Sequence, residues 1–268
     1  MDDLNRYGNW ALITGAASGL GREFAREIAA QNINCVLVDI DSLGIQTLEQ
    51  ELIEDHSIEA RAIESNLAEH QFLNKLLPQI DDLNIGLLIN NAGIACCGAV
   101  ASRDPERMSD LIKVNCLAPV LLTRSLLPGM LERKQGAIVF VSSLQAFISS
   151  PFEATYCASK AFNLHFGESL WGELRKQPVD CITVCPAGMK TDFFRSQGLS
   201  KDECEKLWKV STHPSEVAQL TLRKLGKKSV VSPRASMAVS MLTRLLPRQL
   251  ITRGSEKLAR RLVAYERN

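Results

Sequence analysis

The sequence predicts a single, doubly wound α/β domain with a parallel seven-stranded sheet. Two observations predict this fold class. Short, near-continuous apolar runs recur along the chain, which is typical of strands buried on both faces. Helical patterns separate these runs, and strands that alternate with helices favour a parallel sheet with right-handed crossovers. The 46% hydrophobic content is enough to cover both faces of such a sheet.

The predicted elements alternate from residue 10 onward. The apolar runs predict strands over Trp10–Ile13, Cys35–Val38, Ala60–Ile63, Ile85–Ile89, Ala137–Val141, Cys181–Val184 and Ser229–Val231. Periodic patterns predict helices over Leu20–Gln31, Ser42–His56, Glu69–Leu77, Pro105–Met130, Ala154–Lys176 and Pro214–Leu225. The sequence contains no Pro/Gly/Ser-rich linker, so we expect one domain over residues 1–233 and an extension, not a second domain, over 234–268.

Composition and charge exclude several classes of function. The net charge of +1 gives no general basis for binding nucleic acid. The eight cysteines lack the spacing of a metal site, so we expect none. The N-terminal residues do not resemble a signal peptide, and no apolar run reaches the roughly 18 to 20 residues that span a bilayer. We therefore expect a cytosolic protein.

The extension is the exception to this balanced charge. Residues 234–268 contain eight Lys/Arg and two Asp/Glu, interspersed with Met and Leu and interrupted by Pro247. One interpretation is a helix that contacts an anionic membrane surface. The alternative is a helix that closes the substrate cleft or joins subunits.

A glycine-rich loop follows the first predicted strand. Gly15, Gly19 and Gly21 allow a tight turn and close approach to a pyrophosphate, while the helix that follows offers N–H donors and a positive dipole end. The spacing differs from G-x-G-x-x-G, and a plain tight turn also explains these glycines. Asp39 ends the second strand, where a carboxylate binds both ribose hydroxyls of NAD and repels the 2′-phosphate of NADP. The sequence therefore favours NAD over NADP.

Two further strand ends carry polar groups. Asn90-Asn91-Ala92-Gly93 follows the fourth strand, at the sheet edge where ligands bind in this fold class. Ser142 and Ser143 follow the fifth strand, and Tyr156 and Lys160 lie four residues apart on the next helix, hence on one face. An ammonium beside a phenol stabilises the phenolate, which makes the pair suitable for proton transfer.

These motifs, in this order and at these separations, resemble the short-chain dehydrogenase/reductase family over about residues 8 to 231. The resemblance implies a Rossmann fold and an oxidoreductase that transfers hydride between NAD(P) and a carbonyl or alcohol. It implies Tyr156 as general acid/base, Lys160 as its electrostatic partner, Ser143 rather than Ser142 on the substrate oxygen, and Asn115 holding a water that leads to Lys160. Implied cofactor contacts are Gly15, Ser18, Gly19, Leu20, Gly21, Asp39, Asn66, Leu67, Asn91, Ala92, Gly93, Tyr156, Lys160, Pro186 and Thr191.

The chain departs from the family pattern at two positions. Asn66 stands where the family usually has an Asp that contacts adenine, and Ala187 stands where it usually has Gly. The Asn66 amide still offers hydrogen bonds to adenine. We therefore expect altered cofactor affinity rather than a different function.

The resemblance also implies a substrate lid, over about residues 189–212. Apolar side chains there and after Ser143 favour a hydrophobic substrate such as a steroid, retinoid or acyl chain, although core packing explains them too. They are Phe147, Ile148, Pro151, Phe152, Phe193, Phe194, Leu199, Leu207 and Trp208. Homodimers and homotetramers are common in the family. The alternative function is a nucleotide-sensing regulatory protein without turnover, which has no need of Ser143, Tyr156 and Lys160.

Overall fold

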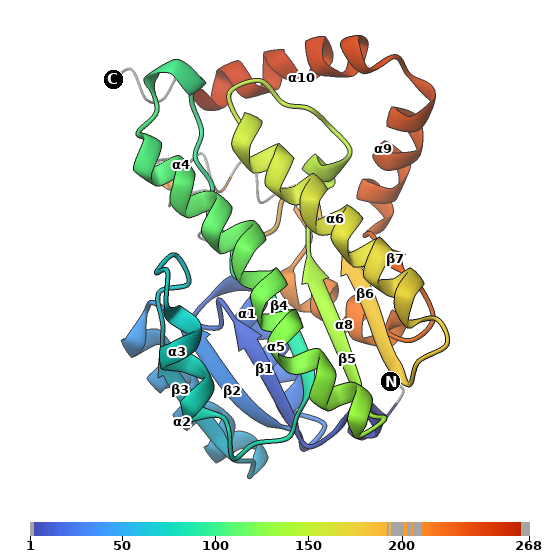
Figure 1. The fold of residues 1–268 in the computed structure, drawn as a ribbon. Coiled ribbons are helices and arrows are strands. Elements are labelled where there is room, and N and C mark those ends of the chain that lie inside the picture. Colours follow the sequence, from blue (N-terminus) through green and yellow to red (C-terminus); the bar gives the residue numbers. More distant parts are fainter. Residues whose placement is uncertain (1–2, 192, 194–200, 203–204, 206–210, 264–268) are drawn as a thin grey trace.

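A computed structural model describes residues 3–191, 193, 201–202, 205 and 211–263. The described residues form one sheet of seven parallel strands (Figure 1). The strands are β1 (Trp10–Thr14), β2 (Asn34–Asp39), β3 (Ala60–Glu64), β4 (Ile85–Asn90), β5 (Gly136–Val141), β6 (Val179–Val184) and β7 (Val230–Val231). The predicted fold class is confirmed.

Helices cover both faces of this sheet. The helices are α1 (Gly19–Ala29), α2 (Ser42–His56), α3 (Phe72–Leu76), α4 (Pro105–Ile112), α5 (Ala118–Glu132), α6 (Ala154–Leu174), α8 (Pro214–Lys224), α9 (Arg234–Leu245) and α10 (Arg248–Val263). One apolar core joins the sheet to α1, α2 and α8, and a second joins it to α3, α5 and α6. The two cores bury both faces of the central strands, as the continuous apolar runs require.

The strand order is β3-β2-β1-β4-β5-β6-β7. The chain therefore reverses its winding direction between β1 and β4, which lie side by side in register from Ala11 opposite Leu87 to Ile13 opposite Ile89. Ligands of open α/β sheets bind beyond the carboxyl ends of the strands at such a reversal. This geometry directs attention to the segments that follow β1, β4 and β5.

The helix predicted over Pro105–Met130 is interrupted in the structure. A π-helical segment, Lys113–Leu117, separates α4 from α5. A continuous α-helix would need the N–H of residue 119 at the Asn115 carbonyl, and Pro119 has none. By length and composition, Pro105–Glu132 is the one stretch among the described residues that meets the criteria for a membrane span, and 44% of its most apolar window is buried inside the protein.

The last two helices stand apart from the layers. In Figure 1, α9 and α10 rise beyond the carboxyl ends of the strands, with α10 crossing above them. Pro247 lies between the two helices, at the interruption that the sequence predicts. Much of the predicted lid, including Phe194, Leu199, Leu207 and Trp208, lies outside the described residues.

Candidate functional site

The loop after β1 is closely packed on the loop after β4. Gly15 has φ +66°, and a Cβ there would lie 2.8 Å from the Cα of Ala92. A Cβ on Gly21 would lie 2.0 Å from the Gly15 carbonyl oxygen, so no larger side chain fits without moving the backbone. Ser18 precedes α1 and makes no side-chain capping bond to it. The start of α1 thus keeps its donors and positive dipole end for an anion such as a pyrophosphate.

Thr14 and Asn91 tie the two loops together. The Asn91 side-chain amide donates to the carbonyl oxygens of Thr14, at 2.9 Å, and Gly15, at 3.0 Å. The Thr14 hydroxyl accepts from the N–H groups of Asn91 and Ala92, both at 3.0 Å. Asn91 therefore fixes the backbone of the glycine-rich loop against the loop after β4. Thr14 was not predicted as a site residue, although it stands at the end of β1, directly before the glycine-rich loop.

Asp39 lies beside the same loop. Its carboxylate accepts from the N–H of Ala17 at 3.0 Å, and from those of Ile40 and Asp41 at 2.7 and 3.1 Å. Ala17 belongs to the glycine-rich loop, so this contact holds the negative charge of Asp39 at the crevice edge. Such a carboxylate suits a ribose diol and opposes a 2′-phosphate.

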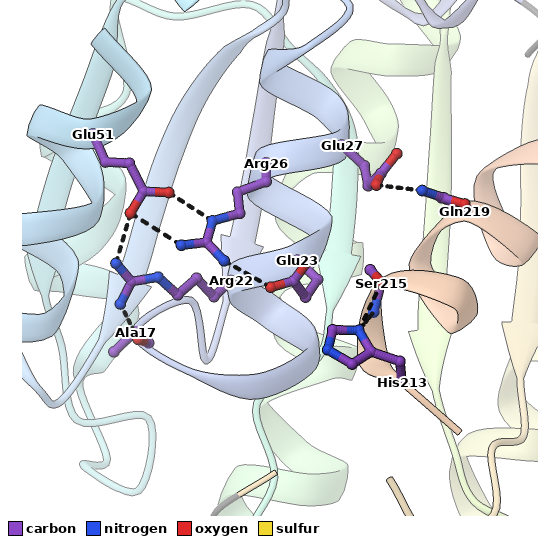
Figure 2. A network of polar contacts seen from close by, with 9 residues as sticks. All are labelled: Ala17, Arg22, Glu23, Arg26, Glu27, Glu51, His213, Ser215 and Gln219. Atoms are coloured by element: carbon purple, nitrogen blue, oxygen red, sulfur yellow. Dashed lines mark hydrogen bonds and ion pairs between the residues drawn. The ribbon is translucent and has the colours of Figure 1, made fainter. Parts of the chain in front are cut away.

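A network of ion pairs connects the glycine-rich loop to α1 and α2 (Figure 2). Glu51 on α2 accepts from Arg22 at 2.8 Å and from Arg26 at 2.6 Å, and Arg22 also donates to the Ala17 carbonyl at 3.5 Å. Hydrogen bonds from Arg26, and then from Arg22, lower the pKa of Glu51 to about 2. The network joins α1, α2 and the loop that contacts Asp39. The network was not predicted, because Glu51 is remote in sequence from both arginines.

The remaining cofactor candidates follow β3 and β6, beyond the carboxyl ends of these strands. Thr191 lies over the start of α1, since a Cβ on Gly19 would come within 3.1 Å of its methyl carbon. The Asn66 side-chain oxygen accepts from the N–H of Ala68 at 3.0 Å, and Leu67 is buried. The Pro186 carbonyl accepts from the N–H of Leu144 at 2.7 Å, which links the segments after β5 and β6.

Lys160, Asn115 and Gly93 converge next to Tyr156. The Lys160 ammonium donates to the Val141 carbonyl at 3.0 Å and lies 5.7 Å from the centre of the Tyr156 ring. A Cβ on Gly93 would lie 3.1 Å from the Lys160 Nζ and 3.5 Å from the Asn115 Oδ1. Tyr156 and Lys160 are only 7% and 4% exposed. Four segments distant in sequence thus bring a phenol and an amine together in a buried space.

Burial disfavours the charged forms of Tyr156 and Lys160, and therefore shifts their pKa values in opposite directions. It raises the pKa of Tyr156, which a hydrogen bond with Ser143 opposes and the negative charge of Glu153 reinforces. It lowers the pKa of Lys160 to about 8. The lowered pKa lets the Lys160 ammonium exchange its proton near neutral pH, whereas the raised pKa keeps Tyr156 in its phenol form.

Asn115 is fixed by both ends of its side-chain amide. It donates to the Ile94 carbonyl at 2.9 Å and to the Ser159 hydroxyl at 3.0 Å, and it accepts from the Ile94 N–H at 2.8 Å. Its backbone lies in the π-helical segment, a feature frequent at functional sites. Ser159, not selected from the sequence, thereby connects Asn115 to the helix of Tyr156 and Lys160.

The two serines after β5 have different partners. The Ser142 hydroxyl donates to the Lys160 carbonyl at 2.6 Å and is buried, so it holds α6 against the sheet. The Ser143 hydroxyl accepts from the N–H of Gln145 at 3.2 Å and contacts Tyr156. The geometry therefore places Ser143, rather than Ser142, beside the phenol.

Apolar side chains and one buried carboxylate also lie near Tyr156. The ring of Phe193 is 5.7 Å from that of Tyr156, and both pack with Ala95 and Leu111. The Glu153 side chain, 9% exposed, accepts from Gln145 at 2.5 Å and from the Cys97 thiol at 3.8 Å. Sequence reasoning missed Glu153, which had no motif to mark it.

Comparison with known proteins gives a consistent picture. A family model described as short chain dehydrogenase matches residues 9–202. The very-long-chain 3-oxoacyl-CoA reductase of Phaeosphaeria nodorum is 32% identical over 236 residues, covering 85% of this chain and 66% of that protein. The chain spans about half to two thirds of the length of such fungal reductases.

Solved structures share the fold. A short-chain dehydrogenase from Sphingobium yanoikuyae in complex with NADPH has a TM-score of 0.78 and 26% identity, covering 87% of this chain and 91% of that chain. A 7beta-hydroxysteroid dehydrogenase has a TM-score of 0.88 and 24% identity, covering 95% of this chain and 99% of that chain. The shared fold therefore extends over nearly the whole molecule.

Proposed function

The chain belongs to the short-chain dehydrogenase/reductase family of nicotinamide-dependent oxidoreductases, and we propose that it interconverts a hydrophobic ketone and its alcohol with NAD(H). The observation that carries this proposal is the convergence of Tyr156, Lys160 and Asn115 next to Gly93, in the loop that packs on the glycine-rich loop. A 3-oxoacyl thioester is the first substrate to test, because the fungal relative is named as a 3-oxoacyl-CoA reductase. The group reduced would be the 3-oxo carbonyl.

The proposed mechanism assigns a separate role to each side chain. When bound, the nicotinamide supplies or accepts the hydride. Tyr156 gives its phenolic proton to the carbonyl oxygen during reduction and takes it back during oxidation. Ser143 donates a hydrogen bond to the same oxygen and orients it. Lys160 returns a proton to Tyr156, and Asn115 holds the water that connects Lys160 to solvent.

The residues around the crevice fit a dinucleotide. Larger side chains at Gly15 and Gly21 would clash with the neighbouring backbone, and the start of α1 offers donors to a pyrophosphate. We propose that Asp39 holds the adenosine ribose and makes NAD the preferred cofactor. The Sphingobium structure is in complex with NADPH, so the preference needs its own test.

A thermal-shift comparison of NADH and NADPH tests the cofactor. Binding to the folded state raises apparent stability by mass action, so NADH should raise the melting temperature more than NADPH does. Substituting Asp39→Ala should reduce this difference. A larger shift with NADPH in the wild-type chain would show that the role given to Asp39 is wrong.

Turnover of a panel of 3-oxoacyl thioesters, steroid ketones and short ketones tests the reaction. Tyr156→Phe should lower kcat by about 10²- to 10⁴-fold, the usual contribution of a general acid/base, while the NADH thermal shift remains. Retained turnover in this variant would refute the mechanism. NADH binding without turnover of any substrate would favour the nucleotide-sensing alternative.

We also propose that the protein forms a homodimer or homotetramer. Leu117, Phe162 and Trp171 on neighbouring helices are exposed apolar side chains, and Phe162 stacks on Phe166 with ring centres 5.8 Å apart. Sedimentation velocity of the wild-type chain measures the oligomeric state directly. A monomer over the full concentration range would contradict the proposal.

A further inference from the structure

The outer side of α9 and the start of α10 form an exposed apolar surface. Its side chains are between 42% and 83% exposed. Met241 and Leu242 follow Met237 by four and five residues, and Leu245 follows Met241 by four, so these side chains share one side of α9. Leu246 and Leu250 continue the apolar surface into the turn at Pro247 and the first turn of α10. We call this surface the α9–α10 face; its residues are Met237, Met241, Leu242, Leu245, Leu246 and Leu250.

The same segment carries positive charge alone. Between residues 234 and 255 the sequence contains four arginines and neither aspartate nor glutamate. Two of them, Arg248 and Arg253, are exposed on α10 beside the apolar side chains. Apolar side chains bordered by arginine match the boundary of an anionic bilayer, where acyl chains meet negative headgroups.

We propose that the α9–α10 face docks on the surface of an anionic lipid bilayer as a peripheral contact. A second copy of this chain is a poorer fit, because a two-fold interface through this face would bring the arginines of both copies into one interface. An apolar patch without acidic residues also lacks the charges that would pair with arginine across such an interface. The lipid surface satisfies both the apolar and the basic side chains.

The position of α10 connects this face to the candidate site. The Ser255 hydroxyl donates to the Ser149 carbonyl at 2.9 Å, and the Arg260 guanidinium lies over the Phe152 ring at 5.4 Å. Ser149 and Phe152 belong to residues 147–153, which lead into α6, the helix of Tyr156; we call this segment the substrate loop. A bilayer on the α9–α10 face would therefore lie next to the substrate loop, and an apolar substrate could enter from the lipid. This last step rests on the proposed function, whereas docking itself does not.

Vesicle flotation of the full chain tests the docking. The protein should float with vesicles of phosphatidylcholine and phosphatidylserine and should not float with phosphatidylcholine alone. The double variant Leu242→Glu/Leu245→Glu should lose binding. The double variant Arg248→Gln/Arg253→Gln should weaken it about thirtyfold, the effect of two basic residues at an anionic surface.

Two controls keep the result interpretable. Ile53→Glu introduces one negative charge at an exposed apolar position on α2, away from the α9–α10 face, and should bind vesicles like the wild type. Tyr156→Phe should also bind normally, so failure of the catalytic proposal leaves the docking result intact. NADH thermal shifts report whether each variant is folded.

Three outcomes would overturn the proposal. They are failure of the wild type to float with anionic vesicles, equal flotation of the Leu242/Leu245 variant, and equal flotation on neutral and anionic vesicles. If sedimentation shows a dimer that the Leu242/Leu245 variant dissociates, and vesicles do not bind, the face belongs to a second copy of the chain.

Discussion

The charged side chain of Lys160 is buried, and burial makes a charge unfavourable. The ammonium is 4% exposed and its pKa is lowered from 10.5 to about 8, because burial penalises the charged form. A shift of this size corresponds to about 3 kcal/mol of free energy. At neutral pH the folded protein therefore holds a destabilising charge, as expected where function rather than stability selects the residue.

Replacing Lys160 by Met should make the protein more stable and inactive. Removing the buried charge should raise the free energy of unfolding by up to about 3 kcal/mol at neutral pH. The folded-state pKa lies below the unfolded-state value, so wild-type stability rises with pH between about 8 and 10.5, and the difference between the two proteins should shrink there.

Urea unfolding at neutral pH and near pH 10 measures this difference. The matched control is Lys176→Met, an exposed lysine on the same side of the sheet, which should change stability little. If Lys160→Met is instead less stable at neutral pH, the hydrogen bond from the ammonium to Val141 outweighs the cost of the buried charge.

Glu153 should contribute to the pH dependence of the reaction. Burial is the largest cause of the raised pKa of Tyr156 and the negative charge of Glu153 adds to it, so Glu153→Gln should lower that pKa. Alcohol oxidation needs the phenolate, hence the rise of kcat/KM with pH should move to lower pH in the variant. The pH profile of oxidation measures this. An unchanged profile, or one moved to higher pH, would show that the two groups are not coupled.

The candidate site shows what a sequence can and cannot reveal about single residues. Tyr156, Lys160, Asn115 and Ser143 were predicted from their motifs, and the structure brings them together. Glu153 was not predicted, because its importance comes from burial and from Gln145 and Cys97, which only the folded chain supplies. Hydrogen-bond partners distant in sequence leave no local pattern.

Elements were predicted best where one pattern determined them. The apolar run at the start of the chain predicts a strand over Trp10–Ile13, and β1 ends one residue later. The helix predicted over Glu69–Leu77 is shorter, since the structure has a five-residue helix, Phe72–Leu76, followed by a 3-10 turn that contains Pro78. The π-helical segment was missed because apolar periodicity does not distinguish it from an α-helix.

The turn from β1 into α1 gives a prediction at this scale. Gly21→Ala should lower NADH affinity by more than about tenfold, because the new Cβ would meet the Gly15 carbonyl oxygen and displace the loop. Gly172→Ala is the matched control. It introduces the same methyl group into the exposed surface of α6, where no described residue beyond its chain neighbours and the local helix backbone lies within 4 Å, and should stabilise the helix by about 0.5–1 kcal/mol.

Isothermal titration with NADH and thermal unfolding distinguish the two glycine variants. Equal NADH affinity in Gly21→Ala and the wild type would mean that the loop accommodates a methyl group. The close packing of this loop would then carry no information about cofactor binding.

The order of the strands in the sheet is a property of the whole molecule, because it depends on pairings between segments distant in sequence. Alternation predicts parallel strands, but it does not predict that β1 lies between β2 and β4. That order depends on which pairings bury the most apolar surface, and it places Asp39 and the glycine-rich loop on one half of the sheet and Tyr156 on the other. The cofactor residues around Asp39 are therefore held by α1 and α2, whereas Tyr156 is held by α6 on the other half of the sheet.

Removing residues 234–268 should affect these two halves differently. The described contacts of α10 with the site run through Ser149 and Phe152 in the substrate loop, whereas the loop at Asp39 is held by α1 and α2. A chain that ends at residue 233 should show a KM for the carbonyl substrate raised about tenfold, the loss of about 1.4 kcal/mol of binding, with NADH affinity unchanged within about twofold.

A smaller change separates loss of these contacts from loss of the helix. Ser255→Ala/Arg260→Ala removes both contacts and leaves α10 in place, so it should raise KM in the same direction by a smaller factor. Substrate kinetics and NADH titration on both variants give the comparison. Ala259 between them is buried, so a truncated chain that loses NADH affinity tenfold, while the double variant keeps it, would show that α10 supports the whole fold rather than the substrate loop.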